Sequence, residues 1–357
     1  NINFIRQVMK IKIKLILFLG LACLLHSCTK IEFEGPSIAT IYGDFELIEP
    51  LIITNKNPSF SSNEQVGFHC EFNKPIEWKI TILGLSTNAI REITGFSNHI
   101  DSNMIIWNGG PSQVPFFSEE DCLIELAFEN EIDTLRDTIT IVSAKTFDNG
   151  IWLEDFENGI PSDGLVYYNT DGGGMTFSVA NDDALLGSSY FKMGGRVNWD
   201  WVLGNLDLPL NINNVSQNSD DLYINIGILS DLQDLHTGQF INILISEETG
   251  TPFNDNPNNN ASDLFEPTME VYKMKVPVDW EGWQLKSFRY SDFEPVSPNN
   301  QTINFNMNPS DIRAIRIACQ ACPSSTGNPV CPENFGKDVR TDIDHIIFTA
   351  NSSLLDQ

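Results

Sequence analysis

The sequence predicts an all-β protein built from two successive sandwich domains. Three runs in its first part, at 65–72, 78–82 and 138–142, alternate apolar and polar residues. A period of two is typical of half-buried strands. Clusters of Asn, Gly, Ser and Pro separate the runs, as turns do. No window between 36 and 145 has a sustained 3.6-residue period, so we expect strands and turns there.

Composition limits the domain number and the partners. The chain has 357 residues and a formal net charge of −27, and a length of this order predicts two domains. Such acidity repels phosphate backbones, so nucleic acid is excluded as a partner. A hydrophobic content of 41% is sufficient for two packed cores.

The first residues have the pattern of an export signal. Three lysines between 10 and 14 precede an apolar run at 15–25, and Ser27 then precedes Cys28. Basic residues, a short apolar core and a small residue are typical of a secretory signal. The run is shorter than the roughly 20 residues that span a bilayer. Its ending resembles a bacterial lipoprotein signal, which implies that Cys28 is lipidated and anchors the protein to the outer membrane.

The segment 1–28 is therefore expected to be a signal peptide and lipobox, with translation starting at Met9. An acidic leader follows at 29–35. It resembles the surface-export signal of Bacteroidota lipoproteins, which implies a place on the cell surface. The alternative for this segment is a solvated linker. The alternative location is the periplasmic face of the outer membrane.

The first domain is expected at 36–145. Cys70 and Cys122 lie on early and late strands with Trp78 between them. This order suits either an inter-sheet disulfide beside a Trp or two free thiols. Several short strands over about 100 residues fit an immunoglobulin-like sandwich. The stretch 78–109 resembles the Ig-like module of flagellar hook-capping proteins, which implies a spacer or docking role.

The second domain is expected at 151–350. Alternating runs recur at 222–229, 239–245, 270–276 and 311–317, and the span fits one jelly-roll sandwich. The opening Asp-Phe-Glu, the central Trp-Glu-Gly-Trp and the acidic closing strand resemble galactose-binding-like jelly rolls. That group includes many carbohydrate-binding modules.

Carboxylates at the two ends of this domain suggest a metal. Asp155 and Glu157 share a strand face because they are two residues apart, as do Asp342 and Asp344. In the resembling folds the first and last strands are neighbours. The resemblance implies Asp155, Glu157 and Asp344 as ligands of a structural Ca²⁺, which prefers oxygen ligands. Solvated or backbone-bonded carboxylates are the alternative.

Aromatic side chains are the predicted ligand-binding groups. Trp199 and Trp201 share one strand face, and a Tyr pair precedes three glycines that would let a ligand approach. The alternative is that these rings fill the core. The predicted ligand-binding residues are Trp199, Trp201, Tyr167, Tyr168 and Arg196.

The remaining cysteines lie close together near the C-terminus. Cys319, Cys322 and Cys331 with His345 have the count of a zinc site. An oxidising compartment instead favours a disulfide, either Cys322–Cys331 or Cys319–Cys331.

Motifs of common hydrolases and phosphate-binding loops are absent from the sequence. We therefore expect a non-catalytic cell-surface lipoprotein that binds a polysaccharide or oligosaccharide beside an outer-membrane transporter complex. A structural or adhesive accessory subunit and a carbohydrate-active enzyme are the alternatives.

Overall fold

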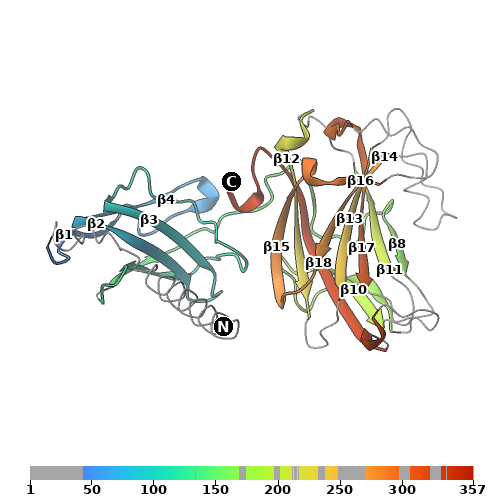
Figure 1. Ribbon diagram of the computed structural model, residues 1–357, viewed down its shortest axis with the longest axis horizontal. Coiled ribbons are helices and arrows are strands. Elements are labelled where there is room, and N and C mark those ends of the chain that lie inside the picture. The colour runs from blue at the N-terminus through green and yellow to red at the C-terminus, as the bar shows by residue number, and fades with distance from the viewer. Residues whose placement is uncertain are drawn as a thin grey trace, which may run out of the picture.

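The computed structural model confirms an all-β protein (Figure 1). It describes residues 43–132, 134–168, 174–196, 202–210, 212, 215, 217–231, 238–247, 270–296, 306–321, 331–334 and 336–356. The signal peptide, Met9 and Cys28 lie outside these residues. Within them, no helix has the length and apolar character needed to cross a bilayer.

Six strands form the first sheet, and a long central strand organises it. The second half of that strand, β2, pairs with β5, its first half pairs with β1, and β3 runs along its other side. The last strand of the sheet also contacts the segment after the first strand, because the Thr140 N–H donates to the Lys56 carbonyl at 2.9 Å. The strands are β1 Leu47–Ile53, β2 Val66–Gly84, β3 Ile90–Ile100, β4 Ile106–Trp107, β5 Asp121–Phe128 and β6 Leu135–Thr140.

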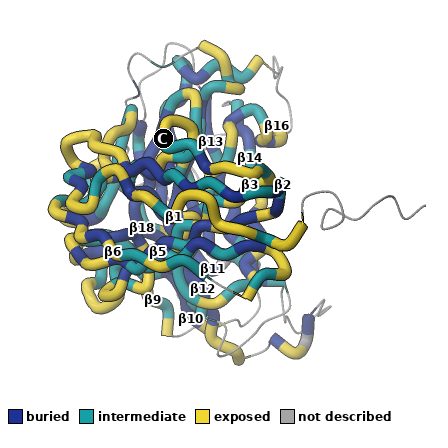
Figure 2. The backbone as a smooth tube through the Cα atoms, turned by 90° about the vertical axis from the view of Figure 1, so that its left-hand side faces the viewer, coloured by how far each residue is buried: buried dark blue, intermediate teal, exposed yellow. Residues whose placement is uncertain are grey.

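Alternation along β2 sends one face into a core. Phe68, Ile80 and Ile82 are fully buried, whereas Lys79 and Thr81, which alternate with them, are exposed or partly exposed. Burying each such side chain contributes about 1.5–3 kcal/mol. Strand β1, at the front of Figure 2, is mostly exposed because it lies at the edge of this sheet.

The predicted disulfide between Cys70 and Cys122 does not form. Both thiols are free and buried. The register pairs Cys122 with Gly84 at the end of β2, whereas Cys70 lies near the strand's beginning and pairs with Ile100. A disulfide needs Cα atoms about 4.4–6.8 Å apart, which these positions cannot provide. Burial raises the pKa of Cys70 to about 11 and of Cys122 to about 12, so both stay protonated.

Two six-stranded sheets pack face to face in the second unit. The β18 sheet has the order β15-β12-β18-β10-β9 with β7 beside β18, and the β17 sheet has the order β16-β14-β13-β17-β11-β8. The β18 sheet contains β7 Trp152–Glu154, β9 Thr176–Ala180, β10 Tyr190–Arg196, β12 Leu222–Ser230, β15 Gly282–Arg289 and β18 Asp338–Ala350. The β17 sheet contains β8 Leu165–Tyr168, β11 Val202–Pro209, β13 Gln239–Glu247, β14 Glu270–Pro277, β16 Glu294–Val296 and β17 Ile312–Ala321.

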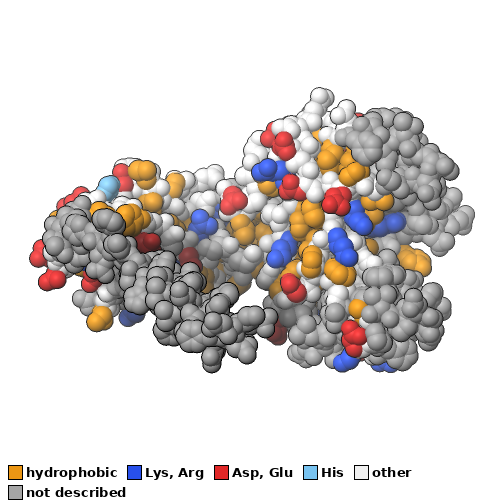
Figure 3. Space-filling model, in the orientation of Figure 1, with side chains coloured by type: hydrophobic (Ala, Val, Ile, Leu, Met, Phe, Trp, Pro, Cys, Tyr) orange, Lys and Arg blue, Asp and Glu red, His pale blue; other side chains and the backbone are white. Residues whose placement is uncertain are grey.

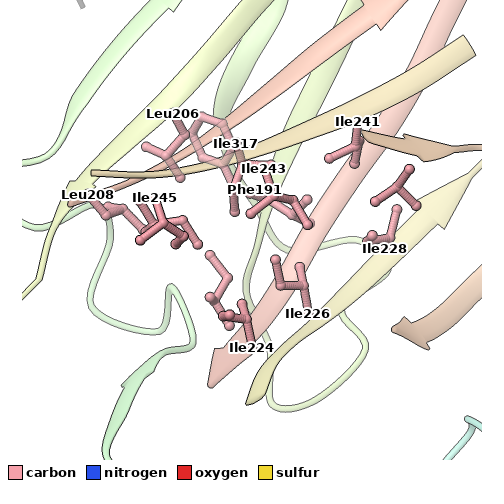
Figure 4. Close-up of a cluster of buried hydrophobic side chains, with 14 of the residues drawn as sticks. Phe191, Leu206, Leu208, Ile224, Ile226, Ile228, Ile241, Ile243, Ile245 and Ile317 are labelled. Atoms are coloured by element: carbon pink, nitrogen blue, oxygen red, sulfur yellow. The ribbon is translucent and has the colours of Figure 1, made fainter. Parts of the chain in front are cut away.

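Aliphatic side chains fill the space between these sheets. Ile224, Ile226 and Ile228 of β12 meet Ile241 and Ile243 of β13, all fully buried (Figure 4). Short 3-10 helices cap the ends of the strands: Phe60–Ser62, Ser219–Asp221, Tyr290–Asp292, Pro309–Asp311, Pro332–Asn334 and Leu354–Asp356. The arrangement is the jelly-roll sandwich predicted from the alternating runs.

A small apolar cluster joins the two units. The first sheet ends at Thr140 and the second unit begins its strands at Trp152. Between them Phe116 packs on Phe147, with ring centroids 4.1 Å apart, and both lie beside Leu354. The C-terminal segment therefore returns to the junction (Figure 1).

Candidate ligand-binding face

The outer face of the β17 sheet carries polar side chains on adjacent strands. On β13, Ile241 and Ile243 point into the core, so Asn242 between them points outward. The register pairs Asn242 with Ala318 of β17, and Ala318 with Asn205 of β11. Paired residues share a face, so both amides lie on the side of the sheet that points away from the core. They are nevertheless only 5–6% exposed.

An ion pair lies at the centre of this face. Arg316 donates two hydrogen bonds to Asp207, from Nε to Oδ1 at 2.7 Å and from Nη2 to Oδ2 at 2.6 Å. Asn205 also donates to Asp207 Oδ1 at 2.8 Å. Burial raises the pKa of Asp207 to about 6, and Arg316 opposes that shift. Two parallel bonds fix the guanidinium plane, so the side chains are held in one geometry.

Further groups extend the face across β13 and β14. Asn242 donates to the side-chain oxygen of Gln320. Lys275 pairs with Asn242 and places its Nζ 3.7 Å from the ring centroid of Phe240, a cation–π contact. Asp207, Asn205 and Asn242 are buried and bonded within this group, so Arg316 and the exposed Lys275 are its more accessible polar side chains.

The two predicted tyrosines lie on opposite faces of the edge strand β8. Tyr167 pairs with Asn205 and is 43% exposed, so its ring borders the polar face. Tyr168 pairs with Gly204 and stacks on Phe177, with centroids 5.6 Å apart and planes 8° apart. A Cβ at Gly204 would meet the Phe177 ring at 2.5 Å. Only Tyr167 therefore belongs to the face.

The other predicted ligand-binding residues do not join Tyr167. Arg196 lies on β10 of the opposite sheet and forms an exposed ion pair with Asp338 at 3.5 Å. It lines a separate cavity of about 260 Å³ with Lys192 and Arg340. Trp199 and Trp201 lie outside the described residues.

Asp344, one of the predicted calcium ligands, binds a loop. Its Oδ2 accepts the N–H of Leu185 at 2.8 Å and of Leu186 at 3.2 Å. Burial raises the pKa of Asp344 to about 7, the backbone donors lower it, and the nearby Glu157 carboxylate raises it. The side chain is fully buried.

The same loop also donates backbone hydrogen bonds to Glu157. Its Oε1 accepts the N–H of Ser188 at 2.6 Å and of Ser189 at 2.7 Å. Asp155 accepts the N–H of Glu157 at 3.1 Å. These contacts are the ones that the backbone-bonded alternative expects. A carboxylate oxygen can accept an N–H bond and bind a cation as well, so the calcium site stays a prediction.

The C-terminal cysteines do not form the zinc site that was considered as an alternative to a disulfide. Cys331 is disulfide-bonded, and its partner is outside the described residues, as is Cys322. Cys319 is a free thiol, so it is not that partner, and burial raises its pKa to about 12. His345 Nε2 contacts the Phe147 carbonyl at 2.7 Å. Among the described residues, Cys319, Cys331 and His345 do not come together as a group of metal ligands.

The sequence analysis missed the central residues of the face. Asn205 and Asp207 alternate with leucines, and Arg316 stands between two isoleucines. This pattern indicates polar side chains on the outer face of interior strands. The pattern alone does not bring β11 and β17 together, because only strand pairing does.

Comparisons with known proteins give distant likenesses. No protein-family model matches the chain, and no curated protein matches it. SGBP-B from a complex xyloglucan utilization locus in Bacteroides uniformis is 10% identical, with 85% of this chain and 74% of that chain covered and a TM-score of 0.32. The K1 cleaved adhesin domain of Lys-gingipain from Porphyromonas gingivalis is 13% identical over 56% and 98%, with a TM-score of 0.31. The CBM22 tandem domain of Paenibacillus barcinonensis Xyn10C is 10% identical over 87% and 93%, also with a TM-score of 0.31.

Proposed function

We propose that the outer face of the β17 sheet binds a polysaccharide or oligosaccharide without catalysis. The observation that carries the proposal is the Asp207–Arg316 pair, which two hydrogen bonds hold in one geometry beside the exposed Tyr167 ring. Asp207 itself is fully buried and orients the guanidinium, so Arg316 and Tyr167 are the groups that would meet a ligand. A sugar presents hydroxyls that donate and accept, and C–H faces that pack on flat rings. Polar groups already fixed in place lose little entropy when a ligand binds.

The spacing of the face supports an extended ligand. Tyr167 on β8 and Phe240 on β13 are separated by β11 and β17. Three strand spacings correspond to roughly 14 Å. Aromatic rings at both ends with polar groups between them would bind a chain of several sugar units better than a single unit.

We further propose that lipidation at Cys28 anchors the protein to the outer membrane, beside a transporter complex. The first sheet would serve as an Ig-like spacer. The lysines before the apolar run and the Ser-Cys pair support the anchor. Metabolic labelling with a fatty acid tests it, and a Cys28→Ala variant should lose the label.

Affinity gels and calorimetry with a panel of neutral polysaccharides test the glycan proposal. Tyr167→Ala should weaken binding at least tenfold because it removes the exposed ring. Tyr168→Ala is the matched control: its ring lies on the same strand but faces the other way, so binding should persist.

Trp199→Ala and Trp201→Ala extend the test to the residues predicted from sequence alone. No retention of the wild-type protein by any polysaccharide would refute the proposal. Binding that survives Tyr167→Ala unchanged would exclude this face as the site. Release of reducing ends would favour the alternative of a carbohydrate-active enzyme.

A further inference from the structure

Two imidazoles and two carboxylates share one face of the first sheet. The register pairs Glu49 of β1 with Glu71 of β2, and Glu71 with His99 of β3. Paired residues lie on the same side of a sheet. His69 is two residues before Glu71 and therefore points the same way. The neighbouring Cys70 is buried in the core, so these four side chains face outward.

Three of the four side chains already converge. One ligand atom from each of Glu49, His69 and Glu71 lies within 4.8 Å of the other two. The closest contact joins His69 Nε2 to Glu49 Oε2 at 2.8 Å. Figure 3 shows a histidine beside acidic side chains on the surface of this unit.

The fourth side chain is within reach. His99 is exposed and stands directly across from Glu71. It lies outside the convergent group, with its Nδ1 3.2 Å from Asn98 Oδ1. Cβ atoms of such cross-strand pairs are about 4.5–5.5 Å apart, so rotation of its side chain would bring the imidazole toward the cluster.

Irregularities in β1 aim Glu49 at this cluster. Register shifts occur on both sides of it, between Leu47 and Glu49 and between Glu49 and Ile52. Bulges of this kind redirect a side chain. Without a cation, the facing carboxylates of Glu49 and Glu71 would repel each other.

We propose that Glu49, His69, Glu71 and His99 form a Zn²⁺ site on the outer face of β1, β2 and β3. Zinc takes four nitrogen, oxygen or sulfur ligands at roughly 2.0–2.3 Å in a tetrahedron. Imidazole ligands favour zinc over calcium, which binds through oxygen alone. The ion would fasten the exposed edge strand β1 to the central strands.

Zinc titration of the chelator-treated protein tests the site. Calorimetry should show one tight equivalent, and the melting temperature should rise with zinc because the ion binds the folded state. Cobalt should give the absorption bands of a tetrahedral complex. Calcium should produce none of these effects.

Variants separate this site from any other. His69→Ala and His99→Ala should each weaken zinc binding tenfold or more, and circular dichroism should show that both variants remain folded. Glu77→Gln, an exposed carboxylate elsewhere on β2, is the matched control and should bind as the wild type does. Absence of zinc binding by the wild type would overturn the proposal, as would undiminished binding by His69→Ala. Undiminished binding by His99→Ala would remove the fourth ligand and contradict the site as stated.

Discussion

At the scale of single residues, Glu247 at the end of β13 is a carboxyl group whose burial favours the protonated form. It is 4% exposed, and it accepts bonds from the Tyr290 hydroxyl at 2.6 Å and the Asn308 N–H at 2.8 Å. Desolvation raises its pKa to about 7; the two bonds oppose the rise, and the nearby Glu270 and Asp311 reinforce it. The folded protein therefore holds a proton that the unfolded chain releases near pH 4.5.

This carboxylate makes stability fall as the pH rises. A pKa raised by folding gives a contribution that is complete below the unfolded value and is lost as the pH rises toward about 7. Between these values one such group changes the free energy of unfolding by about 1.4 kcal/mol per pH unit. Glu247→Gln should flatten the dependence measured by urea denaturation at pH 5, 6 and 7. Glu294→Gln, an exposed carboxylate on β16, should leave it unchanged. An equal slope in the Glu247→Gln variant would contradict this assignment.

At the scale of elements, the pairing of β2 with β3 brings a Trp side chain of β2 close to the backbone of a glycine in β3. Gly95 pairs with Trp78, and a Cβ at Gly95 would lie 2.2 Å from Cζ2 of the indole. The indole is held in place because its Nε1 donates to the Ser97 hydroxyl at 2.9 Å. An added methyl group must therefore displace a ring that has a fixed partner.

Gly95→Ala should lower the free energy of unfolding by about 1–3 kcal/mol, the usual cost of overpacking. Thr94→Ala is the neighbouring control, since its exposed side chain faces away from the indole, and its effect should be within about 0.5 kcal/mol. Guanidinium denaturation measures both. An equal decrease in the free energy of unfolding of the two variants would show that the indole moves aside at no energetic cost.

Strands β2 and β3 also show which features of the fold can be predicted from the sequence. Alternation found the runs 65–72 and 78–82 because one face of each is buried, but it gave two strands where there is one. Pro75 lies between them, at the register shift that separates Glu71 from Ile76. Proline is tolerated at such bulges, so the strand continues through it. The disulfide prediction failed for this reason, since it placed Cys70 on a separate early strand.

The candidate face was predicted less completely. Local patterns identify an exposed or alternating side chain, and Tyr167 was found in this way. Asp207 and Arg316 are far apart in the chain and meet only because β11 pairs with β17. A single sequence does not contain that pairing explicitly, so the residues at the centre of the face were missed.

At the scale of the whole molecule, the two units meet at a small apolar cluster. Phe116 and Phe147 are 7% and 5% exposed, and they pack in one cluster with the buried Leu285, Ile347 and Leu354. Polar contacts accompany it: the Leu285 N–H donates to Gln113 Oε1 at 3.0 Å, and His345 Nε2 contacts the Phe147 carbonyl at 2.7 Å. Interfaces between domains of one chain permit relative motion unless they are large and apolar.

Phe116→Ala should loosen this junction while each core stays intact. Removing a well-packed Phe side chain costs roughly 3–5 kcal/mol, and here the loss falls on the contact between the units. Calorimetry should then resolve two unfolding transitions instead of one, and small-angle scattering should show a larger radius of gyration. Met104→Ala, which removes a side chain that is 76% exposed in the same unit, should change neither measurement. A Phe116→Ala protein with unchanged scattering and a single transition would mean that the remaining contacts hold the units together without this ring.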